Sequence, residues 1–222
     1  MLQSKMQTKI TKKLFRGLYQ YKLVIICAGA SWFRGGDMDS VFNELKKVTI
    51  TTDPSKTGAA TPYYVAWRAG IKTQEDLDYA FKLQAHLKKL TDVEVRVESP
   101  WISVYTNSKL SIDSTIKLDK TKIKYVSVPP ENTLLEQNTI IMPKVGFDYR
   151  ITMGKTIQNH SAFVGWAEAN KKLKLTKACK RELSKDRSWG GTHFYISGDN
   201  NLLMAKMHLG GSINKVERII KV

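Results

Sequence analysis

The strongest constraint on the fold of this chain is a pattern that occurs twice. Residues 19–24 read aromatic, polar, aromatic, basic, aliphatic, and residues 147–152 repeat that order. Farther along each half, two strand-like runs follow at intervals of 22 and 20 residues, beginning at Trp101 and Ile123 and at His193 and Ile213. Self-similarity of this kind predicts two structural units of one type. Chance similarity between amphipathic strands is the alternative.

Strands and helices alternate along the chain. Runs rich in Val, Ile, Tyr and Thr, bounded by Gly, Pro or Asn, predict strands at 19–28, 63–69, 93–99, 101–106, 122–128, 145–153, 193–197 and 213–222. The clearest helical pattern covers 73–90, where Thr73 is a suitable N-cap and apolar residues follow at helical spacing. Shorter helical patterns cover 37–47, 108–118, 161–171 and 200–209.

Each half of the chain can be written β-α-β-β-α-β, the split βαβ or ferredoxin-like order. The first half takes this order from 63 to 128, and the second from 145 to 222, with one element inside 173–183 that reads as strand or helix. Residues 19–52 are then either the first strand and helix of the first unit, followed by an insertion, or a separate βα addition. We therefore predict an α+β protein with two ferredoxin-like units and antiparallel sheets.

Composition shifts suggest where these units begin and end. We expect a basic N-terminal segment at 1–18, a first unit at 19–128 and a second unit at 139–222. The run at 53–62 is small, polar and bounded by proline, and predicts a loop. Residues 129–138 begin with two prolines and predict a linker.

The element order resembles that of tandem ferredoxin-like nucleic-acid-binding proteins, which include paired RNA-recognition motifs and repeat-processing proteins of CRISPR systems. The resemblance covers about 63–128 and 140–222 and concerns order alone. Of the RNA-recognition consensus on the third strand, the chain offers only Trp101 and Tyr105. The resemblance implies a nucleic-acid-binding role, and short basic proteins of this texture are common in bacteriophage genomes.

Charge points to the same class of partner. The chain has 36 Lys and Arg against 20 Asp and Glu, a net charge of +16, which favours a polyanionic ligand. Basic residues concentrate before Asp37 and again between Lys171 and Arg187. The candidate phosphate contacts are Lys12, Lys13, Arg16, Arg34, Lys171, Lys172, Lys174, Lys177, Lys180 and Arg181. A merely solvated basic face is the alternative.

Aromatic residues on the predicted sheets are the candidate base contacts. Residues two apart in a strand share a face, so Trp101 and Tyr105 project together, as do His193 and Tyr195. Trp101, Tyr105 and Tyr195 could stack on unpaired bases. The alternative is that these rings pack against the helices as core.

No sequence motif indicates catalysis, a metal or a cofactor. The four histidines are widely separated and lack the spacing of a zinc site, and Gly29–Gly36 lacks the ending of a phosphate-binding loop. Cys179 lies between two lysines and could have a lowered pKa. We predict no catalytic residues, no metal and no cofactor, and a non-enzymatic role; a small metal-independent ribonuclease using His160 or His193 is an alternative.

The sequence also bears on location and partners. Apolar runs of about 20 residues are lacking, the N-terminus does not read as a secretory signal, and two cysteines make a disulfide framework unlikely. We expect an intracellular protein, in the host cytoplasm or the virion if viral, that binds RNA or single-stranded DNA and no membrane. A structural component of a viral particle or ribonucleoprotein, with a protein partner or self-association, is the other alternative.

Overall fold

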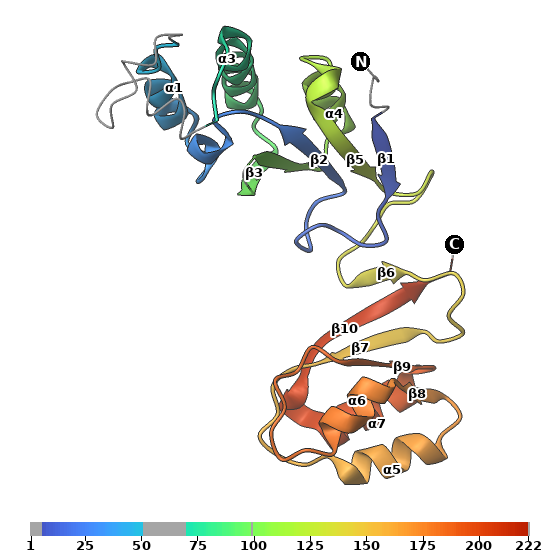
Figure 1. Cartoon of the computed structure of the whole chain (residues 1–222). Coiled ribbons are helices and arrows are strands. Elements are labelled where there is room, and N and C mark those ends of the chain that lie inside the picture. The colour runs from blue at the N-terminus through green and yellow to red at the C-terminus, as the bar shows by residue number, and fades with distance from the viewer. Residues whose placement is uncertain (1–5, 51–69, 99, 222) are drawn as a thin grey trace. The chain divides into compact units, whose positions relative to one another are not determined.

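The computed structural model describes residues 6–50, 70–98 and 100–221. The predicted loop at 53–62 and the predicted strand at 63–69 lie outside these residues. The chain divides into two compact units, Met1–Leu134 and Leu135–Val222. This division falls within 129–138, the segment expected to be a linker. Each unit is a layer of helices on one five-stranded sheet (Figure 1).

In unit 1 the helices alternate with strands along the chain, and the strands form one mixed sheet. Along the chain its elements are β1 (Gln7–Ile10), β2 (Tyr21–Ile26), η1 (Ala30–Phe33), α1 (Met38–Lys46), α3 (Gln74–Lys89), β3 (Val93–Glu98), β4 (Trp101–Thr106), α4 (Lys109–Ile116), η3 (Lys120–Lys122) and β5 (Ile123–Val128). The strand order is β1-β5-β2-β4-β3. All neighbours are antiparallel except β1, which runs parallel to β5.

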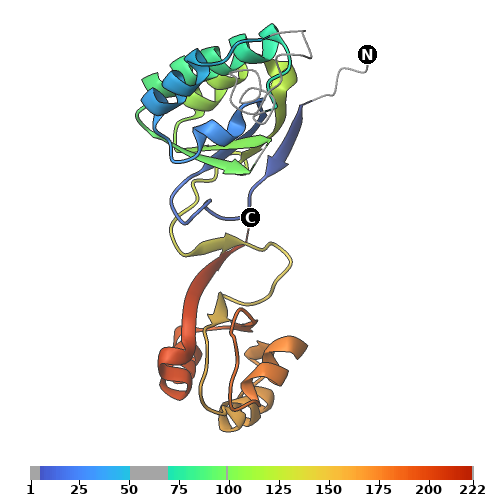
Figure 2. The same cartoon turned by 60° about the vertical axis from the view of Figure 1, so that its left-hand side comes forward.

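Unit 2 repeats this arrangement in the second half of the chain. Its elements are β6 (Thr139–Ile141), β7 (Tyr149–Met153), α5 (Ser161–Ala169), β8 (Leu173–Leu175), α6 (Lys177–Leu183), β9 (His193–Ile196), α7 (Asp199–Leu209), η4 (Gly210–Ser212) and β10 (Ile213–Ile220). The strand order is β6-β10-β7-β9-β8. Again one edge strand, β6, runs parallel to the last strand, β10, and lies beside it in both views (Figures 1 and 2).

The sequence repeat therefore corresponds to a structural one. The matched segments form β2 and β7, β4 and β9, and β5 and β10, and each pair occupies the same position in its sheet. The registers agree as well. Tyr21 of β2 lies opposite Thr106 of β4, and Tyr149 of β7, its counterpart in the repeat, lies opposite Ile196 of β9.

The prediction of an α+β fold is confirmed, with corrections to its parts. Residues 19–52 supply the central strand β2 and the helix α1 of unit 1, so they are not a separate βα addition. The sheets are not purely antiparallel, because β1 and β6 each add a parallel edge strand. The undecided element within 173–183 is both a strand, β8, and a helix, α6.

Helix α3 begins where the sequence predicts it. The Thr73 hydroxyl accepts a hydrogen bond from the Asp76 backbone N–H at 3.1 Å, which satisfies one of the free N–H groups of the first turn. Glu75 and Asp76 in the first turn and Lys88 and Lys89 in the last complement the helix dipole. The buried apolar side chains of α3, Leu77, Tyr79, Ala80, Leu83 and Leu87, belong to the same core cluster as residues of β2 and β4.

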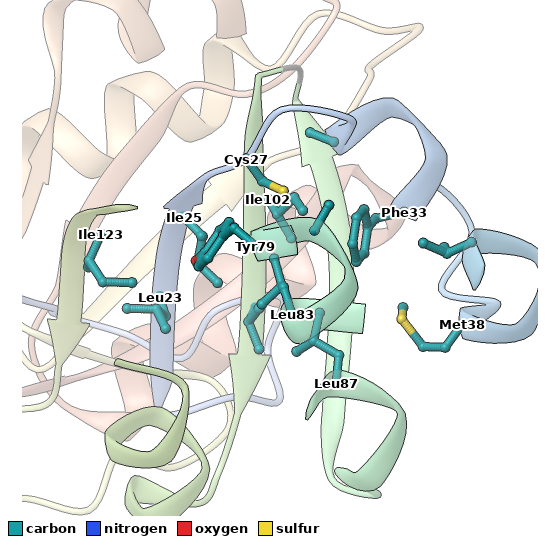
Figure 3. Packing of buried hydrophobic residues seen from close by; sticks show 14 of the residues in the cluster. Leu23, Ile25, Cys27, Phe33, Met38, Tyr79, Leu83, Leu87, Ile102 and Ile123 are labelled. Carbon is teal, nitrogen blue, oxygen red and sulfur yellow. The ribbon is translucent and has the colours of Figure 1, made fainter. Parts of the chain in front are cut away.

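The core of unit 1 lies on one face of its sheet. Alternate residues of β2, Leu23 and Ile25, pack with Ile102 of β4 and with Leu83 and Leu87 of α3 (Figure 3). Residues two apart in a strand share a face, and Val24 between them, although only 3% exposed, lies outside this core cluster. Unit 2 has its own core with the same plan, built from Ile151, Phe163, Phe194, Ile196 and Leu209.

A pair of neighbouring isoleucines tests which face is packed. Ile25 is fully buried, whereas Ile26 is 42% exposed. We expect Ile25→Ala to lower the free energy of unfolding by about 2–5 kcal/mol, because it leaves a cavity in the core. Ile26→Ala, the same truncation one residue on, should cost less than about 1 kcal/mol. Urea denaturation followed by circular dichroism measures both, and equal losses would contradict a one-sided core.

Candidate nucleic-acid interface

The sheet face turned away from the helices carries one line of cross-strand partners in each unit. Because residues directly opposite each other on neighbouring strands point to the same face, the registers define this line. In unit 2 it runs Lys174, Tyr195, Arg150, Glu217 across β8, β9, β7 and β10. In unit 1 it runs Glu94, Tyr105, Lys22, Ser127, Lys9 across β3, β4, β2, β5 and β1. We call this line the tyrosine row.

The centre of the tyrosine row is the same in both units. In unit 1 Lys22 of β2 lies opposite Tyr105 of β4, and in unit 2 Arg150 of β7 lies opposite Tyr195 of β9. In unit 1 the Lys22 Nζ lies 5.4 Å from the centroid of the Tyr105 ring. We call these two combinations the basic–tyrosine pairs. They place a cation next to an aromatic ring, the two groups that hold a phosphate and a base.

In each unit an aromatic ring lies against the tyrosine of the basic–tyrosine pair, and this ring comes just before β2 in unit 1 and just before β7 in unit 2. The Tyr19 and Tyr105 ring centroids are 6.1 Å apart, and the Phe147 and Tyr195 centroids are 5.9 Å apart with nearly parallel planes. In unit 1 Phe15 adds a second ring, 6.0 Å from Tyr105. Tyr105 is therefore only 6% exposed, whereas Tyr195 is half-buried and accessible.

A short turn holds these rings over Tyr105. Phe15 and Tyr19 exchange backbone hydrogen bonds of 2.8 and 2.9 Å, and Arg16 and Gly17 between them have positive φ angles, as a turn of this hand requires. The Arg16 guanidinium forms an ion pair of 3.1 Å with Glu94. The turn thus closes one end of the tyrosine row in unit 1.

Charge on the unit 2 face is strongly positive around one buried carboxylate. Glu217, only 2% exposed, lies 2.9 Å from the Lys215 Nζ and 3.9 Å from the Arg150 Nε. Its single negative charge is opposed by Lys215, Arg150 and Lys174, so the face has a net charge of about +2. The Arg150 Nε is too far from this carboxylate for a hydrogen bond and is buried without a hydrogen-bond partner among the described residues, whereas the Lys215 Nζ donates one to it.

Basic residues of unit 1 gather at the start of the chain. A shallow pocket is lined by Lys9, Lys12, Lys13, Phe15 and Arg16, together with Ser127 of the tyrosine row. Lys9 also lies over the Tyr125 ring at 3.9 Å, and Lys124 lies over the Trp101 ring at 3.1 Å. Three of the residues predicted to contact phosphate, Lys12, Lys13 and Arg16, thus lie together, although Arg16 is engaged with Glu94.

The basic run in unit 2 divides into paired and unpaired residues. Lys180 forms an ion pair with Glu168, and Arg181 lies 3.7 Å from Glu182. Within the described part of the chain, the predicted phosphate contacts without an acidic partner in this run are Lys171, Lys172, Lys174 and Lys177, all of them exposed. Lys174 is the one that the fold places beside a predicted aromatic, Tyr195.

The remaining predicted residues are dispersed. Trp101 is exposed at the far end of the unit 1 face, one position along β4 from the core residue Ile102. Arg34 is exposed at the end of η1. The sequence analysis missed Arg150, Lys215, Lys9 and Lys22 as candidates. The signal was available, because Lys22 and Arg150 are the matching basic positions of the repeat.

The alternative catalytic groups are held in structural environments. His160 is buried, its Nε2 lies 3.0 Å from the Ser212 hydroxyl, and burial lowers its pKa. Burial and the nearby Arg150 lower the pKa of His193, and Glu217 opposes this shift. The suggestion of a lowered pKa for Cys179 is wrong: the thiol is fully buried, which raises its pKa to about 11. The described residues contain no cluster of three or more His, Cys, Asp or Glu suited to a metal ion.

None of the helices in the described ranges has the length and apolar character needed to cross a membrane. Comparison of the chain with protein-family models, with curated proteins and with solved structures finds no match.

The lowered histidine pKa values predict how stability depends on pH. A histidine whose pKa is lower folded than unfolded binds fewer protons in the folded state, so stability is complete above about pH 6.5 and falls as the pH drops through the folded pKa. We expect the free energy of unfolding to decrease between pH 7 and pH 5. His160→Gln should flatten this decrease in urea titrations at several pH values, and an unchanged slope would mean that His160 does not contribute.

Proposed function

We propose that this chain is a non-enzymatic nucleic-acid-binding protein with two ferredoxin-like units, acting on single-stranded nucleic acid or structured RNA. Each unit would bind through the sheet face that the helices leave free. The strand order supports the fold assignment. Without the parallel edge strand, the sheets read β5-β2-β4-β3 and β10-β7-β9-β8, which is last, first, third, second in chain order.

The observation that carries the proposal is the basic–tyrosine pair. It occurs at the same register position in both units, although Lys22 and Arg150 differ in chemistry and the flanking strands differ in sequence. A structural need for one cross-strand contact would be met by any well-packed pair. A cation beside a ring on a helix-free face is what binding of an unpaired nucleotide requires.

Unit 2 is the better equipped of the two faces. Tyr195 is accessible, and Lys174 and Arg150 lie opposite it on the two neighbouring strands. In unit 1 the equivalent tyrosine is covered by Phe15 and Tyr19, and the position equivalent to Lys174 is Glu94. We therefore assign base stacking to unit 2, and phosphate binding to the unpaired lysines of the unit 2 run and to Lys12 and Lys13 of the unit 1 pocket.

Removing the unpaired lysines tests the phosphate contacts. Each phosphate neutralised on a single strand contributes about 0.7 to the slope of log affinity against log salt. The quadruple variant Lys171→Ala, Lys172→Ala, Lys174→Ala and Lys177→Ala should weaken binding to all probes and lower this slope by up to about 3. Fluorescence polarisation with labelled single-stranded RNA, single-stranded DNA and duplex across a salt series measures it.

A matched control removes the same charge elsewhere. Lys82, Lys89, Lys109 and Lys117 are exposed on α3, α4 and their ends, in the helix layer of unit 1. Replacing these four with Ala should leave the slope nearly unchanged. If both quadruple variants lower the slope equally, binding depends on net charge and the unit 2 surface is not the interface.

Tyr195 tests the base contact. Loss of a stacking ring costs about 1–3 kcal/mol per base, so Tyr195→Ala should weaken single-strand binding by roughly 5- to 150-fold. Tyr195→Phe keeps the ring and should bind nearly as the natural protein does. Equal losses for the two variants would assign the effect to the hydroxyl. Gel analysis of the probes after incubation shows whether they are cleaved, the outcome that would favour the ribonuclease alternative.

An assembly role is the second candidate, and one observation favours it. Helix α7 exposes Leu203, Met204 and Met207, an apolar strip that a partner could cover. In that case the basic surface would serve an acidic protein or a packaged nucleic acid. Absence of binding to every probe at low salt would leave this candidate standing and remove the first.

A further inference from the structure

The most exposed large aromatic residue in the described part of unit 2 is Trp189, in the segment that joins α6 to β9. Its side chain is 86% exposed, and Ile157, in the segment that follows β7, is 88% exposed. A tryptophan buries more apolar surface than most side chains when it finds a partner, so leaving it in water is costly. Trp189 lies outside the tyrosine row and is not used by the contacts described above.

The backbone around Trp189 is fixed. Thr156 and Ser188 exchange backbone hydrogen bonds of 3.0 and 3.1 Å, and Met153 bonds with Gly191 and Thr192 at 2.8 Å each. These bonds continue the pairing of β7 and β9 beyond the sheet. We call the paired segments 153–156 and 188–192 the tip of unit 2. Its backbone hydrogen bonds hold the segment that carries Trp189 in place, with the Trp189 side chain exposed to solvent.

The backbones of two glycines, Gly154 and Gly190, also come into contact in this part of unit 2. Gly190 has a φ of +78°, and a Cβ on it would lie 2.4 Å from the Gly154 carbonyl carbon, so the two backbones are in direct contact. The Ser188 hydroxyl accepts a hydrogen bond from the Gly190 N–H and donates one to Glu182 of α6. The residues on either side of Trp189 are thus tied to the body of unit 2.

Cations flank the exposed ring. The Lys155 Nζ lies 5.1 Å from the Trp189 ring centroid. Arg187, two residues before Trp189, is exposed and has no acidic partner among the residues that the structure describes, and Asp186 is the neighbouring acid. An exposed ring with one cation beside it and a second cation two residues away in the chain fits a ligand that is flat and apolar in one part and anionic in the next.

We propose that Trp189 is a second stacking site, which binds an unpaired base while Lys155 and Arg187 contact the phosphates beside it. The inference rests on the proposed nucleic-acid binding and makes it more specific, because bases in a duplex are already stacked on each other and offer no free face. The ligand of unit 2 is therefore single-stranded, or carries unpaired nucleotides.

The test compares Trp189→Ala and Trp189→Phe in the full chain. We expect Trp189→Ala to weaken binding of a single-stranded oligonucleotide by about 5- to 150-fold and Trp189→Phe by less, while affinity for a blunt duplex stays the same. Intrinsic tryptophan fluorescence of the natural protein should be quenched by the single strand, with much of this quenching lost in Trp189→Phe. Because the side chain is exposed, both variants should keep the circular dichroism spectrum and melting temperature.

Leu110→Ala is the matched control. Leu110 is 81% exposed on α4 of unit 1, so this variant removes a comparably exposed apolar side chain, and it should leave all affinities unchanged. An unchanged single-strand affinity in Trp189→Ala, with the natural protein binding normally, would overturn the inference and leave the proposed function intact. Failure of the natural protein to bind any probe would overturn both.

Binding to anionic vesicles tests whether Trp189 contacts a lipid surface instead of nucleic acid. Trp and basic side chains also suit a lipid surface. If vesicles of phosphatidylserine and phosphatidylcholine bind the natural protein but not Trp189→Ala, while single-strand binding is the same for both, the ring contacts lipid and the inference is wrong. Lack of vesicle binding together with loss of single-strand affinity supports it.

Discussion

In the residues that the structure describes, each sheet has helices on one face only, and this one-sidedness determines which side chains each face can carry. The hydrophobic effect accounts for the inner face, where Leu23, Ile25 and Ile102 in unit 1 meet α3. The outer face has no helix over it among the described residues, although Val24 and Tyr105 of unit 1 are buried there. It is instead covered by rings and by the aliphatic stems of basic residues, as with Lys22 and Tyr105, so that the groups which shield the outer face are of the kind that binds nucleotides.

In both units an aromatic ring covers the tyrosine of the outer face, but the residues around it differ. In unit 1 the turn at Arg16 places two rings over Tyr105 and ties itself to Glu94, which makes this face more closed. Unit 2 has Lys174 where unit 1 has Glu94, and a single ring, Phe147, against Tyr195. The repeated fold thus has one covered and one accessible tyrosine.

Local signals carried much of the fold. The cap at Thr73 and the matched segments of the repeat depend on near neighbours in sequence, and the structure agrees with them. The parallel edge strands were not predicted, because β1 and β6 are only 4 and 3 residues long and the partner of β1 is more than a hundred residues away. Alternation identified Tyr195 and the basic run identified Lys174, but only the register shows that they are neighbours. The burial of Tyr105 by Phe15 and the exposure of Trp189 depend on contacts that no local pattern encodes.

The parallel edge strands also bear on the order in which the chain can fold as it is made. Gln7 of β1 pairs with Tyr125 of β5, and β5 in turn lies against β2. The first strand of unit 1 therefore has no partner until the last strand of that unit has been synthesised, and pairing over such a separation is slow. During translation the backbone groups of β1 stay without their strand partner until nearly the whole of unit 1 has been made. In unit 2 the strand β6 likewise waits for β10, so each half of the protein closes its sheet only at its last step.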